Sequence, residues 1–323
     1  MNNKAIGGYF GLDSRGTDFR QCADALLFNS GRSALTALLR ADSGVTTVWV
    51  PDWYCPDVKR AISLTGLKLR EYAVDESLEI VEIPELRKDE LLVGVDYFGV
   101  KGEYMRMLHD RLGTRLIIDN CQSWWGFLPA DAKVFYSPRK FFGVADGGAA
   151  VGAEAEYYAG LPEGRSAMRY GAVLERVDAD AESGYLDFRR AERSIGEEGA
   201  TKMSPLTASI LGNLDMQEMR MRRIDNFRRL HNRLGRYNRL RDIRVHAAMA
   251  YPLLCHDGGL ADRLRGALQT RRVYVARYWD GAENDCRLTE RVVALPVDHR
   301  CDANDMAYVA DITEKILMEY GNA

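Results

Sequence analysis

Lys140 is the residue whose surroundings suggest chemistry first. It stands in a stretch, residues 134–152, that predicts a short apolar strand, a polar turn, a glycine pair and a second strand. A lysine among apolar groups loses hydration of its ammonium, so we expect its pKa to fall and its free amine to act as a nucleophile toward carbonyl compounds. The alternative is an ordinary surface lysine in a hairpin turn. The aromatic residues around it are Phe135, Tyr136, Phe141 and Phe142.

Asp119 is the second residue of interest, because it ends an apolar run at residues 116–118. A buried parallel strand would deliver this carboxylate to the carboxyl edge of a sheet. An aspartate at a strand end more commonly caps the following helix, and that role stays open. Together with Lys140 it has another use, since a pyridinium cofactor needs an anion at its ring nitrogen and a lysine for its aldehyde. The pair therefore indicates pyridoxal 5'-phosphate (PLP).

Both segments resemble a known family. Residues 116–122, Leu-Ile-Ile-Asp-Asn-Cys-Gln, are similar to the Asp-x-x-Gln segment of the DegT/DnrJ/EryC1/StrS family of PLP-dependent aminotransferases, which have fold type I. Residues 137–148, Ser-Pro-Arg-Lys-Phe-Phe-Gly-Val-Ala-Asp-Gly-Gly, are similar to that family's Schiff-base lysine segment. Each motif is weak alone, but further similar segments follow in the family's order. They lie at residues 29–35, 50–56, 202–206 and 295–306.

The resemblance implies a transaminase that moves an amino group from an amino acid such as glutamate to a keto-sugar or similar carbonyl acceptor. Lys140 would hold the cofactor aldehyde and then move a proton as general base. Asp119 would pair with the ring nitrogen, and Gln122 with the phenolic oxygen. Some relatives replace this lysine with histidine and catalyse dehydration, so the retained Lys140 favours transamination.

The cofactor phosphate has a predicted place at the start of a helix over residues 31–40. First-turn amides of a helix are free donors that attract an anion, and the resemblance implies that Gly31, Arg32 and Ser33 surround the phosphate. Arg32 stands where the family more often has threonine, and its guanidinium could serve the substrate instead. Ser137, in the lysine segment, is a further cofactor-binding candidate.

Aromatic residues complete the predicted site. Trp53 or Tyr54 would stack on the pyridine ring, with burial in the core as the alternative for Trp53. Tyr278 and Trp279 follow a predicted strand and are substrate candidates, although buried packing suits them equally. Tyr9 belongs to a glycine-rich N-terminal segment that we expect to form an arm near the site.

Strand and helix signals alternate from residue 28 to 152, which predicts an α/β fold with a mainly parallel sheet and helices on both faces. With the resemblance, this is an aspartate-aminotransferase-like PLP fold. We expect an N-terminal arm at 1–20, a large PLP-binding domain at 21–215 and a small α+β C-terminal domain at 216–323. The predicted strands are 46–50, 67–74, 91–95, 251–255, 272–277 and 292–295, and a long helix is predicted from 203 to about 240.

Composition excludes several other classes of protein. The chain has 323 residues, a net charge of −3 and a pI near 6.0, which argues against nucleic acid as a partner. Neither an apolar stretch of membrane-spanning length nor an N-terminal signal core is visible, and the cysteines and histidines show no metal-binding spacing. We therefore expect a cytoplasmic protein without a metal or a membrane partner.

Alternatives remain at this stage. One is a non-catalytic PLP-binding regulator, and another is a PLP-dependent dehydratase or lyase. An unrelated nucleotide-binding protein has less support, because no glycine-rich phosphate motif follows a strand. A homodimer is implied by the resemblance alone. Ala200 stands where sugar-nucleotide members usually have an asparagine that reaches the partner's phosphate site, which weakens the expectation of a phosphate shared across the dimer.

Overall fold

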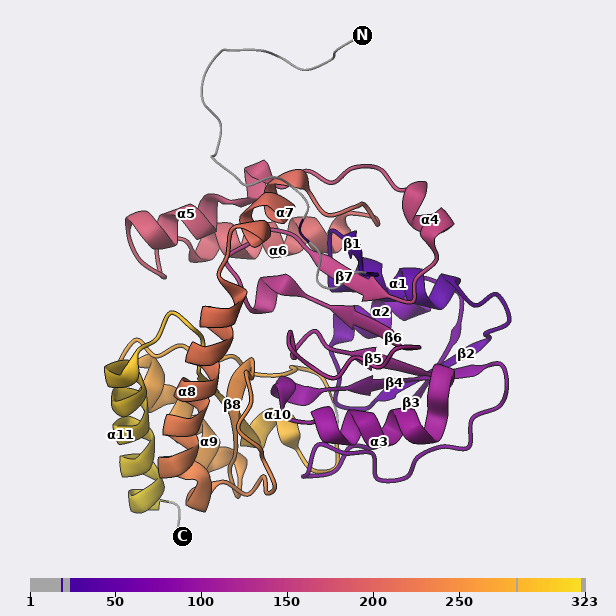
Figure 1. Ribbon diagram of the computed structural model, residues 1–323. Helices are drawn as coiled ribbons and strands as arrows, with labels where there is room; N and C mark the ends of the chain where they lie inside the picture. The colour runs from indigo at the N-terminus through magenta and orange to yellow at the C-terminus, as the bar shows by residue number, and fades with distance from the viewer. Residues whose placement is uncertain (1–18, 20–23, 283, 321–323) are drawn as a thin grey trace, which may run out of the picture.

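A seven-stranded sheet forms the body of the computed structural model, which describes residues 19, 24–282 and 284–320. Its strand order is β1-β7-β6-β5-β4-β2-β3, and β7 runs antiparallel to both of its neighbours while the other pairs are parallel (Figure 1). The mainly parallel sheet predicted from the alternating pattern is therefore confirmed. The strands are β1 (Leu26–Phe28), β2 (Thr47–Pro51), β3 (Lys68–Tyr72), β4 (Glu90–Val95), β5 (Leu116–Asp119), β6 (Lys133–Tyr136) and β7 (Gly148–Val151).

Helices cover both faces of this sheet. Helix α3 lies on one face, and α1 and α2 lie on the other (Figure 1). The central strands β4 and β5 are buried along their whole length, as expected for parallel strands that helices cover on both faces of the sheet. The helices of this part are α1 (Gly31–Arg40), α2 (Pro56–Ser63), α3 (Gly102–Leu112), α4 (Ala155–Ala159), α5 (Gly171–Asp178), α6 (Tyr185–Glu197) and α7 (Pro205–Gly212).

A second hydrophobic cluster lies in the C-terminal part of the chain. It joins α8, α9 and α11 to a two-stranded antiparallel sheet of β8 and β9, around residues such as Phe227, Leu264 and Met306. Helix α8 runs from the large sheet into this cluster (Figure 1). The separate small domain at 216–323 stays a prediction, which this cluster supports. The elements are α8 (Met216–Leu234), β8 (Ala250–Leu254), α9 (Gly258–Gln269), α10 (Leu288–Arg291), β9 (Val292–Pro296) and α11 (Ala303–Tyr320).

Two expected elements are wrong. The single helix from 203 to about 240 is broken after α7, because Asp215 caps a new helix by accepting a bond from Glu218 N at 2.9 Å. The expected strand at 272–277 has no strand neighbour and is irregular. Its alternation reflects half-burial instead, since Val273 and Val275 pack against the second cluster.

The predicted arm at 1–20, with its substrate candidate Tyr9, lies outside the described residues apart from Phe19. Within the described ranges, no helix combines the length and the apolar character needed to cross a membrane.

Candidate active site

Three of the segments singled out in the sequence meet at the carboxyl edge of the sheet. Asp119 ends β5 and pairs with Phe135 of β6. A Cβ atom on Gly31, at the start of α1, would lie 3.0 Å from Cys121 Sγ and 3.6 Å from Ser137 Cβ. The lack of a side chain at Gly31 thus allows α1 to begin directly against the segments that follow Asp119 and precede Lys140.

Asp119 is a buried carboxylate, 4% exposed, with a donor on each oxygen. Tyr54 Oη donates to Oδ2 at 2.6 Å, and Cys121 N donates to Oδ1 at 2.8 Å. Burial raises the pKa of Tyr54 well above its usual value, and the charge of Asp119 raises it further, so this phenol remains a donor at neutral pH. The carboxylate is therefore fixed in one orientation.

Lys140 ends a short 3-10 helix, η3 (Pro138–Lys140), and its side chain is solvent-accessible. Burial among protein groups lowers its pKa, but Cys121, then Asp119, Cys55 and Tyr278, together raise it by more, and the net direction is upward. The expected lowered pKa is therefore wrong. The aromatic neighbours dominate the sequence around Lys140, whereas groups brought in from other segments, Cys121 first and then Asp119, make the net shift upward. The same interaction shows that Lys140 and Asp119 lie near each other.

Gln122 offers a free donor at this edge. Its Oε1 accepts a bond from Phe98 N at 2.6 Å, in the turn η1 (Tyr97–Gly99), while its buried Nε2 has no hydrogen-bond partner among the described residues. A buried N–H without an acceptor is costly. An acceptor such as the phenolic oxygen of PLP would satisfy it, so the side chains at this edge fit that cofactor.

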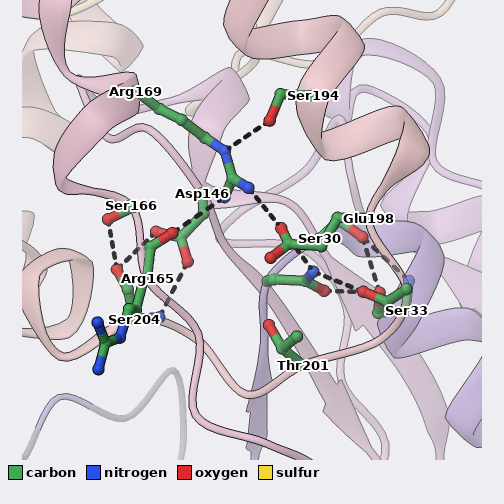
Figure 2. Close-up of polar contacts among 12 residues, drawn as sticks. Ser30, Ser33, Asp146, Arg165, Ser166, Arg169, Ser194, Glu198, Thr201 and Ser204 are labelled. Atoms are coloured by element: carbon green, nitrogen blue, oxygen red, sulfur yellow. Dashed lines mark hydrogen bonds and ion pairs between the residues drawn. The ribbon is translucent and has the colours of Figure 1, made fainter.

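The start of α1 supplies the expected cap (Figure 2). Ser30 is its N-cap and accepts a bond from Ser33 N at 3.2 Å, and Ser33 Oγ donates to Asn29 Oδ1 at 2.7 Å. Asn29 Nδ2 in turn donates to Gly199 O at 2.9 Å. The stretch that carries Ala200 therefore lies against α1 of its own chain.

Arg32 points away from this cap. Its guanidinium lies 3.4 Å from the Asp57 carboxylate and lines a hollow of about 670 Å³ that α2 and α6 also border. The backbone amides of Gly31 and Arg32 precede the capped Ser33 N and are thus the donors of α1 best suited to a phosphate.

The aromatic candidates form one group. Trp53 is fully buried, and its Nε1 donates to Thr289 Oγ1 at 3.0 Å, which favours the core role for this ring. Its ring centroid lies 5.1 Å from that of Trp279. Burial raises the pKa of Tyr278 and the charge of Lys140 lowers it, so Tyr278 lies beside the lysine. The structure thus brings Tyr278 and Trp279 to the same edge as Lys140.

Asp146 is a buried residue whose role the sequence did not suggest. Its carboxylate accepts bonds at 2.9 Å from both Ser204 N and Ser204 Oγ, and it also binds Thr207, which fixes the first turn of α7 (Figure 2). Gly148, two residues later, also cannot be replaced without strain, because a Cβ there would lie 2.1 Å from Ser30 O. The Asp-Gly-Gly motif was the available signal.

Asp96 is a second missed carboxylate. It follows β4, fully buried, and its N donates to Asp119 O at 3.1 Å. Burial raises the pKa of Asp96 to about 6, although the nearby Ser123 side chain and the backbone amide of Lys101 lower it. Its position after the apolar run at 91–95 was the signal that could have identified it, as it did for Asp119.

Comparisons with known proteins agree with this fold. No family model and no curated protein matches the chain. Among solved structures, a DegT DnrJ EryC1 StrS aminotransferase from Brucella abortus is 16% identical with a TM-score of 0.61, covering 90% of this chain and 85% of that one. Helicobacter pylori PseC, an aminotransferase involved in the biosynthesis of pseudoaminic acid, is 14% identical with a TM-score of 0.63 over 92% and 87%.

The sugar aminotransferase CalS13 from Micromonospora echinospora is 17% identical, with a TM-score of 0.62 over 90% of this chain and 87% of that one. These likenesses show that the chain has the fold of the DegT/DnrJ/EryC1/StrS aminotransferases, and the predicted fold class is confirmed.

Proposed function

We propose that this protein is a PLP-dependent aminotransferase that moves an amino group from an amino acid such as glutamate to a keto-sugar or similar carbonyl acceptor. The observation that carries the proposal is the position of Lys140 beside the buried Asp119. Support comes from the fold and from neighbours described as sugar aminotransferases, including CalS13. Bound PLP supplies an aldehyde that reacts with amines and a ring that accepts electrons.

The side chains divide the work among them. Asp119 would hold the proton on the ring nitrogen of bound PLP, and Tyr54 keeps that carboxylate oriented. Lys140 Nζ removes a proton from the α-carbon of the donor and returns it one step later. Gln122 Nε2 would donate to the phenolic oxygen of PLP, and Ser137, with the first turn of α1, would hold its phosphate. Tyr278 and Trp279 form the wall on the substrate side.

The direct test is covalent capture. Reduction of the purified protein with borohydride should fix the cofactor on the peptide that contains Lys140, and Lys140→Ala should abolish this adduct. Lys133→Ala is the matched control, since Lys133 lies on β6 and pairs with Asp42 at 3.5 Å. An adduct on another lysine, or none at all, would refute the proposal.

The reaction type is tested with the same protein. Addition of glutamate should bleach the yellow colour of the loaded protein, and a keto-sugar should restore it. Bound cofactor that responds to no amino donor would identify a PLP-binding regulator instead. Conversion of substrate without net amino transfer would identify a dehydratase or lyase.

The proposal includes a homodimer in the cytoplasm. The dimer is implied by the family that the sequence resembles, and apolar side chains exposed on α5 and α6 offer a surface for it.

A further inference from the structure

Helix α8 reaches the lysine segment through a buried arginine. Arg223 Nη2 donates to Phe141 O at 3.1 Å, and Nη1 donates to Ala248 O at 3.0 Å. The guanidinium also lies 4.8 Å from the centroid of the Phe141 ring. Arg223 therefore connects α8 with the residue directly after Lys140.

Four buried side-chain nitrogens, one on Arg223 itself and three on other residues, have no hydrogen-bond partner among the described residues. They are Arg220 Nε, Arg223 Nε, His246 Nδ1 and His299 Nδ1. Burial and then the charge of Arg220 lower the pKa of His246, and burial and then Arg223 lower that of His299, so each imidazole lies near one of the two guanidinium groups. Arg220 and Arg223 are one helical turn apart. The four side chains form what we call the α8 basic cluster.

The carboxylates near the α8 basic cluster already have partners. Glu218 pairs with Arg222 at 2.7 Å, and Asp298 binds Arg300 at 2.8 Å. In the described part of the chain, neither Arg220 nor Arg223 forms an ion pair of its own. Buried donors and buried positive charge are both costly without an acceptor. An oxyanion would satisfy them, because its oxygens accept strong bonds from guanidinium groups and from neutral imidazoles that carry their proton on Nδ1.

The cluster also borders the candidate active site through the backbone. Met249 N donates to Phe98 O at 2.8 Å, and Phe98 N donates to Gln122. The ring of His299 lies 6.3 Å from that of Phe142, two residues after Lys140. An anion held here would lie beside the loops that carry the lysine and the glutamine.

We propose that the α8 basic cluster is a subsite for an oxyanion, a phosphate or carboxylate group carried by the substrate. The assignment to a substrate rests on the proposed function, whereas the binding of an oxyanion does not. The acceptor or donor would then be held at two points, by its reacting group at Lys140 and by its anion at α8.

Titration calorimetry with inorganic phosphate and with succinate tests this inference on the cofactor-loaded protein. Arg220→Met and His246→Gln should each weaken binding of the preferred probe by about tenfold, because each removes one charge-assisted contact. Arg228→Met is the control, since Arg228 is an exposed residue on the same helix that lies 3.5 Å from Asp225. Preference for phosphate indicates a phosphorylated substrate, and preference for succinate indicates a carboxylate.

Equal affinity in Arg220→Met, His246→Gln and the wild type would overturn the subsite, as would the absence of binding of both probes. The titration is repeated on Lys140→Ala, so that the outcome does not depend on the cofactor. Probe binding that needs Arg220 in a protein that never captures PLP would refute the proposed function and retain the anion subsite.

Discussion

The hydrogen bond between Tyr54 and Asp119 can be removed with little other change. Tyr54→Phe keeps the ring but leaves one oxygen of a buried carboxylate without its 2.6 Å donor. Bonds to charged groups contribute about 1.5–3 kcal/mol, so we expect the dissociation constant for PLP to rise by roughly tenfold or more. Equilibrium dialysis measures this constant.

Tyr72→Phe is the matched control for this change. Tyr72 is also buried, but its hydroxyl donates at 2.6 Å to the backbone Val93 O and not to the Asp119 carboxylate. Both variants should lose stability, and only Tyr54→Phe should lose affinity for PLP. Equal losses of affinity would contradict the role given to Tyr54.

Asp96 predicts a pH dependence of stability. The pKa of Asp96 is about 6 in the folded protein, against an ordinary value of 3.8 that applies to the unfolded chain. The folded state therefore binds this proton more tightly. The free energy of unfolding should fall as the pH rises from about 4 to 6 and then level off, with a loss of about 3 kcal/mol. Asp96→Asn should remove this loss. Urea unfolding of the wild type and of Asp96→Asn at pH 4 and pH 7 measures this loss. The same loss in both proteins would show that Asp96 is not its source.

Individual residues differ in how far the sequence could assign them. Asp119 and Lys140 were predictable because each follows an apolar strand, and strand ends of a parallel sheet meet at one edge. The pKa direction of Lys140 was not predictable, since Cys121 and Asp119 approach from another segment of the chain. The ion pair of Arg32 was not predictable either, because its partner Asp57 lies on α2. A position on a helix does not by itself fix where a long side chain points.

Gly148 determines how closely β7 can approach α1. A methyl group there would lie 2.1 Å from Ser30 O, so Gly148→Ala must displace the start of α1. We expect a loss of about 3 kcal/mol in the free energy of unfolding, as for overpacked sites. Gly266→Ala in α9 is the control, since nothing lies within 4 Å of its Cβ position. The free energy of unfolding of Gly266→Ala should rise by about 0.5–1 kcal/mol. Similar effects from the two variants, measured by urea unfolding, would contradict this packing.

The elements themselves were predicted unevenly. β4 and β5 were clear from their unbroken apolar runs, whereas β1 has only three residues and depends on its pairing with β7. The break before α8 did carry a signal, an aspartate followed three residues later by glutamate, which is typical of a helix start. The false strand at 272–277 shows that alternation records burial and cannot reveal whether a neighbouring strand exists.

The surface of the whole molecule predicts how two copies would meet. Leu174, Val177 and Leu186 on α5 and α6 are 60%, 81% and 68% exposed. Burial of such side chains is favourable, so we expect a dimer in analytical ultracentrifugation and its loss in Val177→Lys/Leu186→Lys. Val81 is 65% exposed but lies outside α5 and α6, so Val81→Lys should leave the dimer intact. A wild-type monomer at all concentrations would contradict the proposal.

The pairing of β1 has a consequence for synthesis on the ribosome. Its partners are β7 and, through Phe28, Lys202, so the strand is translated long before either of them. At 5–20 residues per second, the roughly 120 residues from Phe28 to Gly148 of β7 take on the order of 6–24 s to emerge. During that interval β1 has no strand partner, and its unpaired backbone groups can pair with other chains.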